Sequence, residues 1–260
     1  MNLPKNIVFS GGGLMGIKML KAIKGIEDKI GGILRDKLEL QKVSGCSIGS
    51  LIGLGVVLGF SADEFLEKVI PRSDNYMALF GDMNLTCMAK YYGFLSNEII
   101  AESVDNAVSL KYEEYKDQSI SFQELFDLTG IEFNVSVANV NTLEGEIWNY
   151  KSQPDMPVSF AIQASTCIPI LFAPIKYNGD IYVDGGIIDY LPYKCSENEC
   201  DTLYFLFIKT HERVNIKSFV SFLSRLSFDM IDKNYQICNT SNTFYFRQDR
   251  NFWDMNMNYE

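Results

Sequence analysis

The stretch that decides the fold is residues 38–60, which read LELQKVSGCSIGSLIGLGVVLGF. Residues 38–43 predict a strand, and the apolar residues 50–60 predict a buried helix. Between them lies the turn Gly45-Cys46-Ser47-Ile48-Gly49. A strand that leads through a glycine-rich turn directly into a helix is the unit from which α/β folds are built.

The same unit occurs at the start of the chain. A short strand within residues 5–9 ends in Ser10-Gly11-Gly12-Gly13, and apolar residues at helical spacing predict a helix over residues 14–30. The repetition predicts an α/β fold of three layers, in which a mostly parallel central sheet carries helices on both faces.

The rest of the chain continues this alternation without a linker, an internal repeat or a low-complexity tract. Further helices are predicted at residues 96–110, 121–128, 157–166 and 216–231, and strands at residues 133–140, 146–150, 171–176, 180–183, 202–208 and 243–246. We therefore expect one domain over residues 1–260, with an insertion at 71–95 and with residues 193–260 completing the domain.

Composition argues against several kinds of partner. The chain carries 33 acidic and 23 basic side chains, a formal net charge of −10, whereas binding of a phosphate backbone favours a basic face. Six scattered cysteines predict free thiols in a reducing, cytoplasmic compartment. With one histidine, His211, and no ligand spacing, neither a metal nor a cofactor is expected. The uncharged segment 43–62 is long enough to span a membrane. Its five glycines and four serines, however, favour a buried helix over a transmembrane segment.

Two of the glycine-rich places carry candidate catalytic residues. Gly45-Cys46-Ser47-Ile48-Gly49 matches G-x-S-x-G, in which a serine occupies a sharp turn and the glycines leave room for strained backbone. Asp184-Gly185-Gly186 follows a predicted strand, where an Asp-Gly pair commonly caps a turn. Because a serine nucleophile needs a base, the candidates for that role are Asp184 and His211.

The third place, Gly11-Gly12-Gly13, precedes a predicted helix, where backbone N–H groups suit a phosphate or an oxyanion. No G-K-[ST] follows, which disfavours a P-loop. Together with Gly16 the cluster also fits the G-x-G-x-x-G of dinucleotide-binding proteins. That fingerprint needs an acid at the end of a second strand, but the candidates Glu27 and Asp28 fall inside the predicted helix.

Four motifs together resemble the patatin-like phospholipases in order and spacing. They are Ser10-Gly11-Gly12-Gly13-Leu14-Met15-Gly16, Gly45-Cys46-Ser47-Ile48-Gly49, Ala164-Ser165-Thr166-Cys167-Ile168-Pro169 and Tyr182-Val183-Asp184-Gly185-Gly186. The resemblance covers about residues 7–192. It implies a three-layer α/β/α lipid acyl hydrolase of the phospholipase A type, which acts on lipid at a membrane surface.

The resemblance also implies a role for each matching residue: Ser47 is the nucleophile, Asp184 is the base, and the N–H groups of Gly11, Gly12 and Gly13, chiefly the last two, form the oxyanion hole. The family usually has Arg or Lys where Met15 stands and often Asn where Asp189 stands. The alternatives are a Ser47-Asp184-His211 esterase, an acyltransferase that uses the same acyl-enzyme, and a catalytically silent lipid-binding relative.

Residues 76–95 are an unusually apolar segment. More than half of the twenty residues are large and apolar, and Asp82 and Lys90 are the two charges among them. An exposed patch of this size exceeds what monomers usually tolerate. The segment is therefore predicted to be either a cover or membrane-contacting surface beside the site, or ordinary core packing.

Overall fold

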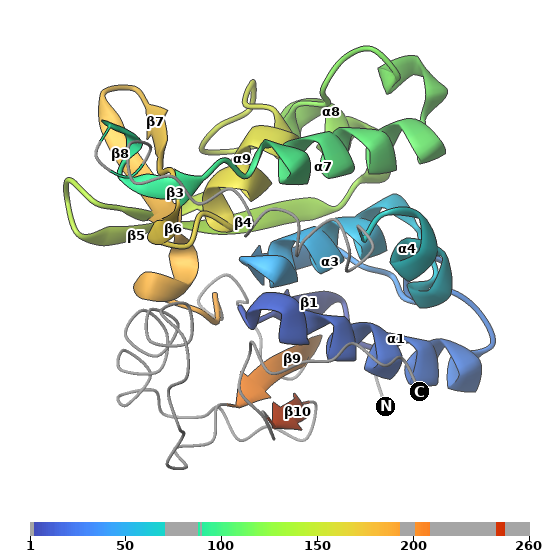
Figure 1. The fold of residues 1–260 in the computed structure, drawn as a ribbon. Coiled ribbons are helices and arrows are strands. Elements are labelled where there is room, and N and C mark those ends of the chain that lie inside the picture. Colours follow the sequence, from blue (N-terminus) through green and yellow to red (C-terminus); the bar gives the residue numbers. More distant parts are fainter. Residues whose placement is uncertain (1–2, 71–87, 89, 193–200, 209–242, 248–260) are drawn as a thin grey trace.

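The computed structural model describes residues 3–70, 88, 90–192, 201–208 and 243–247 (Figure 1). Its centre is an eight-stranded sheet in the order β10-β9-β1-β2-β4-β8-β7, with β5 paired to β4. The strands of this sheet are β1 (Asn6–Phe9), β2 (Lys42–Cys46), β4 (Glu132–Asn139), β5 (Glu144–Trp148), β7 (Ile175–Tyr177), β8 (Asp180–Asp184), β9 (Thr202–Ile208) and β10 (Thr243–Arg247). Two short strands, β3 (Gly93–Leu95) and β6 (Ile170–Phe172), pair with each other.

The sheet is mostly parallel. Strands β10, β9, β1, β2 and β4 pair in parallel, whereas β8 pairs antiparallel with both β4 and β7, and β5 pairs antiparallel with β4. The carboxyl ends of parallel neighbours meet at one edge, which is where ligand sites form in α/β sheets.

Helices connect the strands, as the α/β class requires. They are α1 (Ile17–Ile30), α2 (Leu34–Lys37), α3 (Ile48–Leu58), α4 (Ala62–Lys68), α7 (Glu98–Lys111), α8 (Phe122–Thr129) and α9 (Val158–Ser165), with short 3-10 helices η1 (Gly13–Gly16), η2 (Glu113–Tyr115) and η3 (Gly185–Ile187). Helix α3 lies against β1 and β2, and α9 lies against β4 and β8 (Figure 1). The predicted α/β class is confirmed. The predicted helix at 216–231 lies outside the described residues.

Alternate residues of β1 are buried on opposite faces of the sheet. Ile7 and Phe9 of β1 join the main core cluster under the described helices, whereas Val8 joins a smaller cluster with Tyr204 and Leu206 of β9. This period of two is what a strand between two covered faces requires.

Two predicted boundaries are wrong for identifiable reasons. The strand expected at 38–43 is β2, which begins at Lys42, because pairing with β1 sets the register Asn6↔Lys42 and carries the strand through Gly45 to Cys46. The strand expected at 171–176 is divided into β6 and β7, because Pro174 lies between them and has no N–H to donate to a ladder.

None of the described helices is by itself long and apolar enough to cross a membrane. Helices α3 and α4 meet the length and composition requirement only as a pair, and they are bent by 117° at the break between them. Every residue of α3 is buried, as expected for a core helix.

Candidate active site

Ser47 stands at the point where β2 turns into α3. Its backbone has φ 54° and ψ −129°, a conformation that non-glycine residues rarely adopt. The turn holds the side chain at the carboxyl end of the sheet and at the first turn of a helix, and 5% of the residue is exposed. The strained serine turn predicted from G-x-S-x-G is therefore present in the structure.

Both glycines of this motif allow close backbone contacts. A Cβ on Gly45 would lie 2.5 Å from the carbonyl oxygen of Gly49, and a Cβ on Gly49 would lie 2.5 Å from the carbonyl oxygen of Ser10. Real Cβ atoms do not approach backbone this closely, so any side chain here would push α3 away from β1 and β2. The two glycines thus place Ser47 beside the loop that begins at Ser10.

Asp184 reaches Ser47 from the end of β8. The hydroxyl Oγ of Ser47 donates to Oδ2 of Asp184 at 2.6 Å, and the N–H of Gly186 donates to Oδ1 at 2.8 Å. Asp184 is fully buried. One carboxylate oxygen is therefore held by η3 while the other accepts the serine hydroxyl.

Ser165, at the end of α9, is a residue whose function the sequence did not reveal. Its buried hydroxyl accepts the N–H of Ser47 at 2.9 Å and donates to the carbonyl oxygen of Ser136 in β4 at 2.6 Å. The sequence contained Ser165 within a motif, but no pattern indicated that this hydroxyl would bind the strained turn. Ser50 supports the same turn, because its hydroxyl donates to the carbonyl oxygen of Ser47.

The glycine cluster lies beside Ser47. A Cβ on Gly11 would be 3.6 Å from Cβ of Ser47, and the N–H of Gly11 donates to the carbonyl oxygen of Tyr190 at 2.7 Å. Gly13 has φ 53°, a left-handed conformation that favours glycine. Among the described residues, no partner accepts the N–H groups of Gly12 and Gly13.

The thiol next to the serine is held in its protonated form. Cys46 is buried, and its Sγ lies 3.9 Å from Oδ1 of Asp184. Burial, and then the nearby carboxylates of Asp184 and Asp189, raise the pKa of the Cys46 thiol well above its usual range. Since the thiolate is the reactive form, Cys46 is not a candidate nucleophile at neutral pH.

The remaining sequence candidates have other positions. His211 and the side chain of Met15 lie outside what the structure describes. Glu27 is in α1, and its Oε2 accepts the N–H of Ala62 at the start of α4, so it serves a helix end and not a dinucleotide. No metal-binding cluster of His, Cys, Asp or Glu is found within the described residues.

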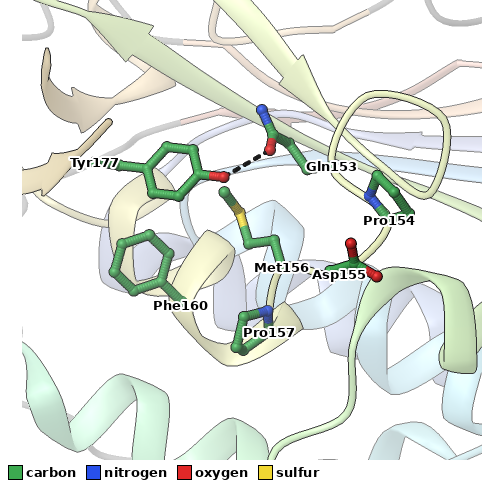
Figure 2. Close-up of a pocket in the computed structure, with 7 residues that line it drawn as sticks. All are labelled: Gln153, Pro154, Asp155, Met156, Pro157, Phe160 and Tyr177. Atoms are coloured by element: carbon green, nitrogen blue, oxygen red, sulfur yellow. Dashed lines mark hydrogen bonds between the residues drawn. The ribbon is translucent and has the colours of Figure 1, made fainter. Parts of the chain in front are cut away.

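Two cavities in the described part of the chain lie apart from the candidate active-site residues. One, of about 340 Å³, is lined by residues 153–157 with Phe160 and Tyr177, and the Tyr177 hydroxyl donates to Oε1 of Gln153 (Figure 2). It contains none of the candidate residues. The other, of about 460 Å³, takes Ala138 of β4 and Ile181 and Val183 of β8 into its lining. Neither cavity is lined by Ser47, Asp184 or residues 11–13.

Sequence similarity to known proteins identifies the family of this chain. The family model described as patatin-like phospholipase matches residues 7–194. The chain is 30% identical over 192 residues to a probable lipid hydrolase, 463L, of Invertebrate iridescent virus 6, covering 72% of this chain and 61% of that protein. It is 23% identical over 197 residues to the intracellular phospholipase A2 of Caenorhabditis elegans, covering 72% of this chain and 16% of that protein.

A solved structure shares the fold. The crystal structure of VipD from Legionella pneumophila superposes with a TM-score of 0.56 at 17% identity, covering 94% of this chain and 61% of VipD. The chain therefore spans less than two thirds of the length of VipD, as it does of the two relatives above.

Proposed function

Because the chain belongs to the patatin-like phospholipase family, we propose that it hydrolyses carboxylic esters of lipids with Ser47 as nucleophile and Asp184 as general base. The observation that carries this proposal is the 2.6 Å hydrogen bond from Oγ of Ser47 to Oδ2 of Asp184. A serine hydroxyl is a weak nucleophile until an adjacent base accepts its proton. Asp184 is the group within reach of that proton, and Gly186 fixes its orientation.

The reaction proceeds in two steps. Oγ of Ser47 attacks the ester carbonyl carbon while its proton passes to Asp184, and the carbonyl oxygen becomes an oxyanion. The adduct collapses with cleavage of the ester C–O bond, and the leaving alcohol takes the proton from Asp184. Water then attacks the acyl group on Ser47 and gives a proton to Asp184. The fatty acid leaves as Oγ of Ser47 regains that proton.

Backbone N–H groups stabilise the oxyanion in this proposal. We assign this role to Gly12 and Gly13, while the N–H of Gly11 anchors the loop to Tyr190. The N–H of Ser47 itself is bonded to Ser165 and is therefore not assigned this role. Loss of such a donor typically costs on the order of 100- to 1000-fold in rate.

Ser165 acts as a positioning residue in this scheme. Ser165→Ala leaves the N–H of Ser47 and the carbonyl oxygen of Ser136 without a partner in a buried site. Leaving a buried polar group unpaired costs roughly 1–3 kcal/mol, so we expect kcat on a soluble short-chain ester to fall by about tenfold or more. KM should change little, because Ser165 does not face the substrate.

A matched pair of variants tests this role. Ser159→Ala removes another buried hydroxyl from α9 and should leave kcat near its original value, whereas Ser165→Thr keeps a hydroxyl and should restore part of the lost activity. Equal losses of kcat in Ser159→Ala and Ser165→Ala would mean that the effect is a general weakening of α9. Steady-state kinetics with separate kcat and KM values distinguish a positioning role of Ser165 from a general weakening of α9.

His211→Ala separates the proposed pair from a triad. If Asp184 is the base, ester hydrolysis by His211→Ala should remain near-normal, because no step uses an imidazole. A Ser47-Asp184-His211 triad would instead lose several orders of magnitude in kcat, since each member of such a unit is needed. The measurement is the initial rate on a soluble ester at pH 7.

The lipid class is identified by direct assay. Purified protein is incubated with phospholipids, galactolipids and neutral lipids, and released fatty acid is measured, with Ser47→Ala as the control. Free fatty acid formed by the unsubstituted protein and not by Ser47→Ala supports hydrolysis. Transfer of the acyl group to an added alcohol in place of water would identify an acyltransferase, and no turnover of any lipid would contradict the proposal.

A further inference from the structure

The end of α9 supports both candidate catalytic residues. The hydroxyl of Ser165 accepts the N–H of Ser47 at 2.9 Å. The carbonyl oxygen of Cys167, two residues further on, accepts the N–H of Asp184 at 2.9 Å. A shift of residues 165–167 would therefore change the distance between Oγ of Ser47 and Oδ2 of Asp184.

Asn97, which immediately precedes α7, binds the end of α9. Helices α7 and α9 lie against each other (Figure 1). Nδ2 of Asn97 donates to the carbonyl oxygen of Gln163 at 2.7 Å and, at 3.5 Å, to the hydroxyl of Thr166. Asn97 is 2% exposed, so water has little access to replace these bonds. The amide is therefore a buried connection between the two helices.

The carbonyl oxygen of Gln163 belongs to the last turn of α9. The last four carbonyl groups of an α-helix have no N–H partner within that helix, so other donors must satisfy them. At Gln163 two side chains do so: Nδ2 of Asn97 at 2.7 Å and the hydroxyl of Thr166 at 3.1 Å. Asn97 thus fixes the helix end two residues before Ser165.

The side chain of Asn97 does not serve its own helix. Asparagine is favoured at the N-cap position because its side-chain oxygen can accept an N–H of the first helical turn. Asn97 occupies the N-cap position of α7, yet in the described structure its side chain makes no such bond. The hydroxyl of Ser96 instead accepts the N–H of Glu98 in that turn. The contact with α9 is therefore the role that the structure gives to this amide.

We propose that Asn97 is a positioning residue of the active site, which sets the separation of Ser47 and Asp184 by fixing the end of α9. The inference rests on the proposed function, in which a proton passes between these two side chains across a 2.6 Å hydrogen bond. Asn97 acts through Ser165 and Cys167, which bind the two catalytic residues. Because a misplacement of about 1 Å at a reacting group can cost on the order of 100-fold in rate, a small shift of α9 is enough.

The test begins with Asn97→Ser in the full chain. Serine is also a favoured N-cap residue, so the start of α7 is preserved, but its shorter side chain does not reach the carbonyl oxygen of Gln163. We expect kcat on a dissolved short-chain ester to fall by about tenfold or more, since a buried partner is left unpaired and the helix end shifts. KM should change little, because Asn97 does not contact the reacting residues.

Two control variants separate this effect from a general weakening of α7. Ile100→Val removes a buried methyl group from the first turn of the same helix and keeps the amide of Asn97. Asn106→Ser makes the same substitution at an exposed position of α7. Both controls should keep kcat near its original value at a temperature where thermal unfolding shows every variant to be folded.

Amide hydrogen exchange gives a second readout that does not depend on turnover. The N–H groups of Ser47 and Asp184 are protected by their bonds to Ser165 and Cys167. In Asn97→Ser, peptides that contain Ser47 or Asp184 should exchange faster than the same peptides of Ile100→Val. If Asn97→Ser does not fold, Thr166→Val, which removes the other side-chain donor to Gln163, takes its place with the same expected results.

A double variant tests the route through α9. Asn97→Ser and Ser165→Ala both act at the end of this helix, so their effects should not be independent. The loss of kcat in the double variant should be smaller than the product of the two single losses.

Three results would overturn the inference and leave the proposed function standing. They are an equal loss of kcat in Asn97→Ser and Ile100→Val, unchanged exchange at Ser47 and Asp184 in Asn97→Ser, and a double variant whose loss equals the product of the single losses. Full activity of Ser47→Ala would instead overturn the proposed function. Faster exchange at Ser47 and Asp184 in Asn97→Ser would then still support the role of Asn97 in fixing their positions.

Discussion

Ser47→Ala and Asp184→Asn are each expected to lower kcat for ester hydrolysis by on the order of 10⁴-fold or more. The first change removes the attacking atom. The second keeps the shape of the side chain and an oxygen for the N–H of Gly186, but an amide cannot accept the proton of Ser47. Because both residues act on one proton transfer, the double variant should be little slower than either single variant.

The control for this prediction is the stability of each variant. Both substitutions are close in size to the original residue, so thermal unfolding should show a folded protein in each case. Rates near the original in Asp184→Asn would remove Asp184 as the base. A double variant whose loss equals the product of the two single losses would show that the residues act independently.

Gly49→Ala is expected to destabilise the protein strongly and to abolish activity with it. The added Cβ would lie 2.5 Å from the carbonyl oxygen of Ser10 and 2.7 Å from that of Phe9, and backbone on both sides leaves little room to relax. Overpacking of this kind typically costs about 1–3 kcal/mol in the free energy of unfolding. The shift of α3 also moves Ser47 away from the glycine loop, so activity should fall more than stability alone explains.

Gly25→Ala is the matched control for that glycine. Gly25 lies inside α1, and a Cβ there would meet nothing within 4 Å, so the change should raise the free energy of unfolding by about 0.5–1 kcal/mol. Urea unfolding of the two variants measures both effects. Similar stability of Gly49→Ala and Gly25→Ala would contradict the close packing of α3 against β1.

Sequence patterns predicted the parts of this molecule that depend on local chemistry. Glycines that flank Ser47 indicated a sharp turn, and repeated strand, turn and helix units predicted the parallel sheet. The position of β2 was missed because its boundaries depend on pairing with β1, a contact between residues far apart in the chain. Ser165 was missed for the same reason, since its partners are Ser47, in the turn after β2, and Ser136 in β4.

The role of residues 76–95 stays a prediction. They were predicted to be either a cover or membrane-contacting surface, or ordinary core packing, and among them the structure describes residues 88 and 90–95. In this described part Tyr91 and Tyr92 are exposed, whereas Leu95 is buried.

The most direct test of the central claim is covalent labelling with a fluorophosphonate probe, followed by mass spectrometry of the modified peptide. Oγ of an activated serine displaces fluoride from phosphorus, and its proton passes to the adjacent base. We expect one adduct, on Ser47, formed rapidly in the unsubstituted protein, much more slowly in Asp184→Asn and not at all in Ser47→Ala. An adduct on another residue, or labelling of Asp184→Asn at the original rate, would contradict the proposed roles of Ser47 and Asp184.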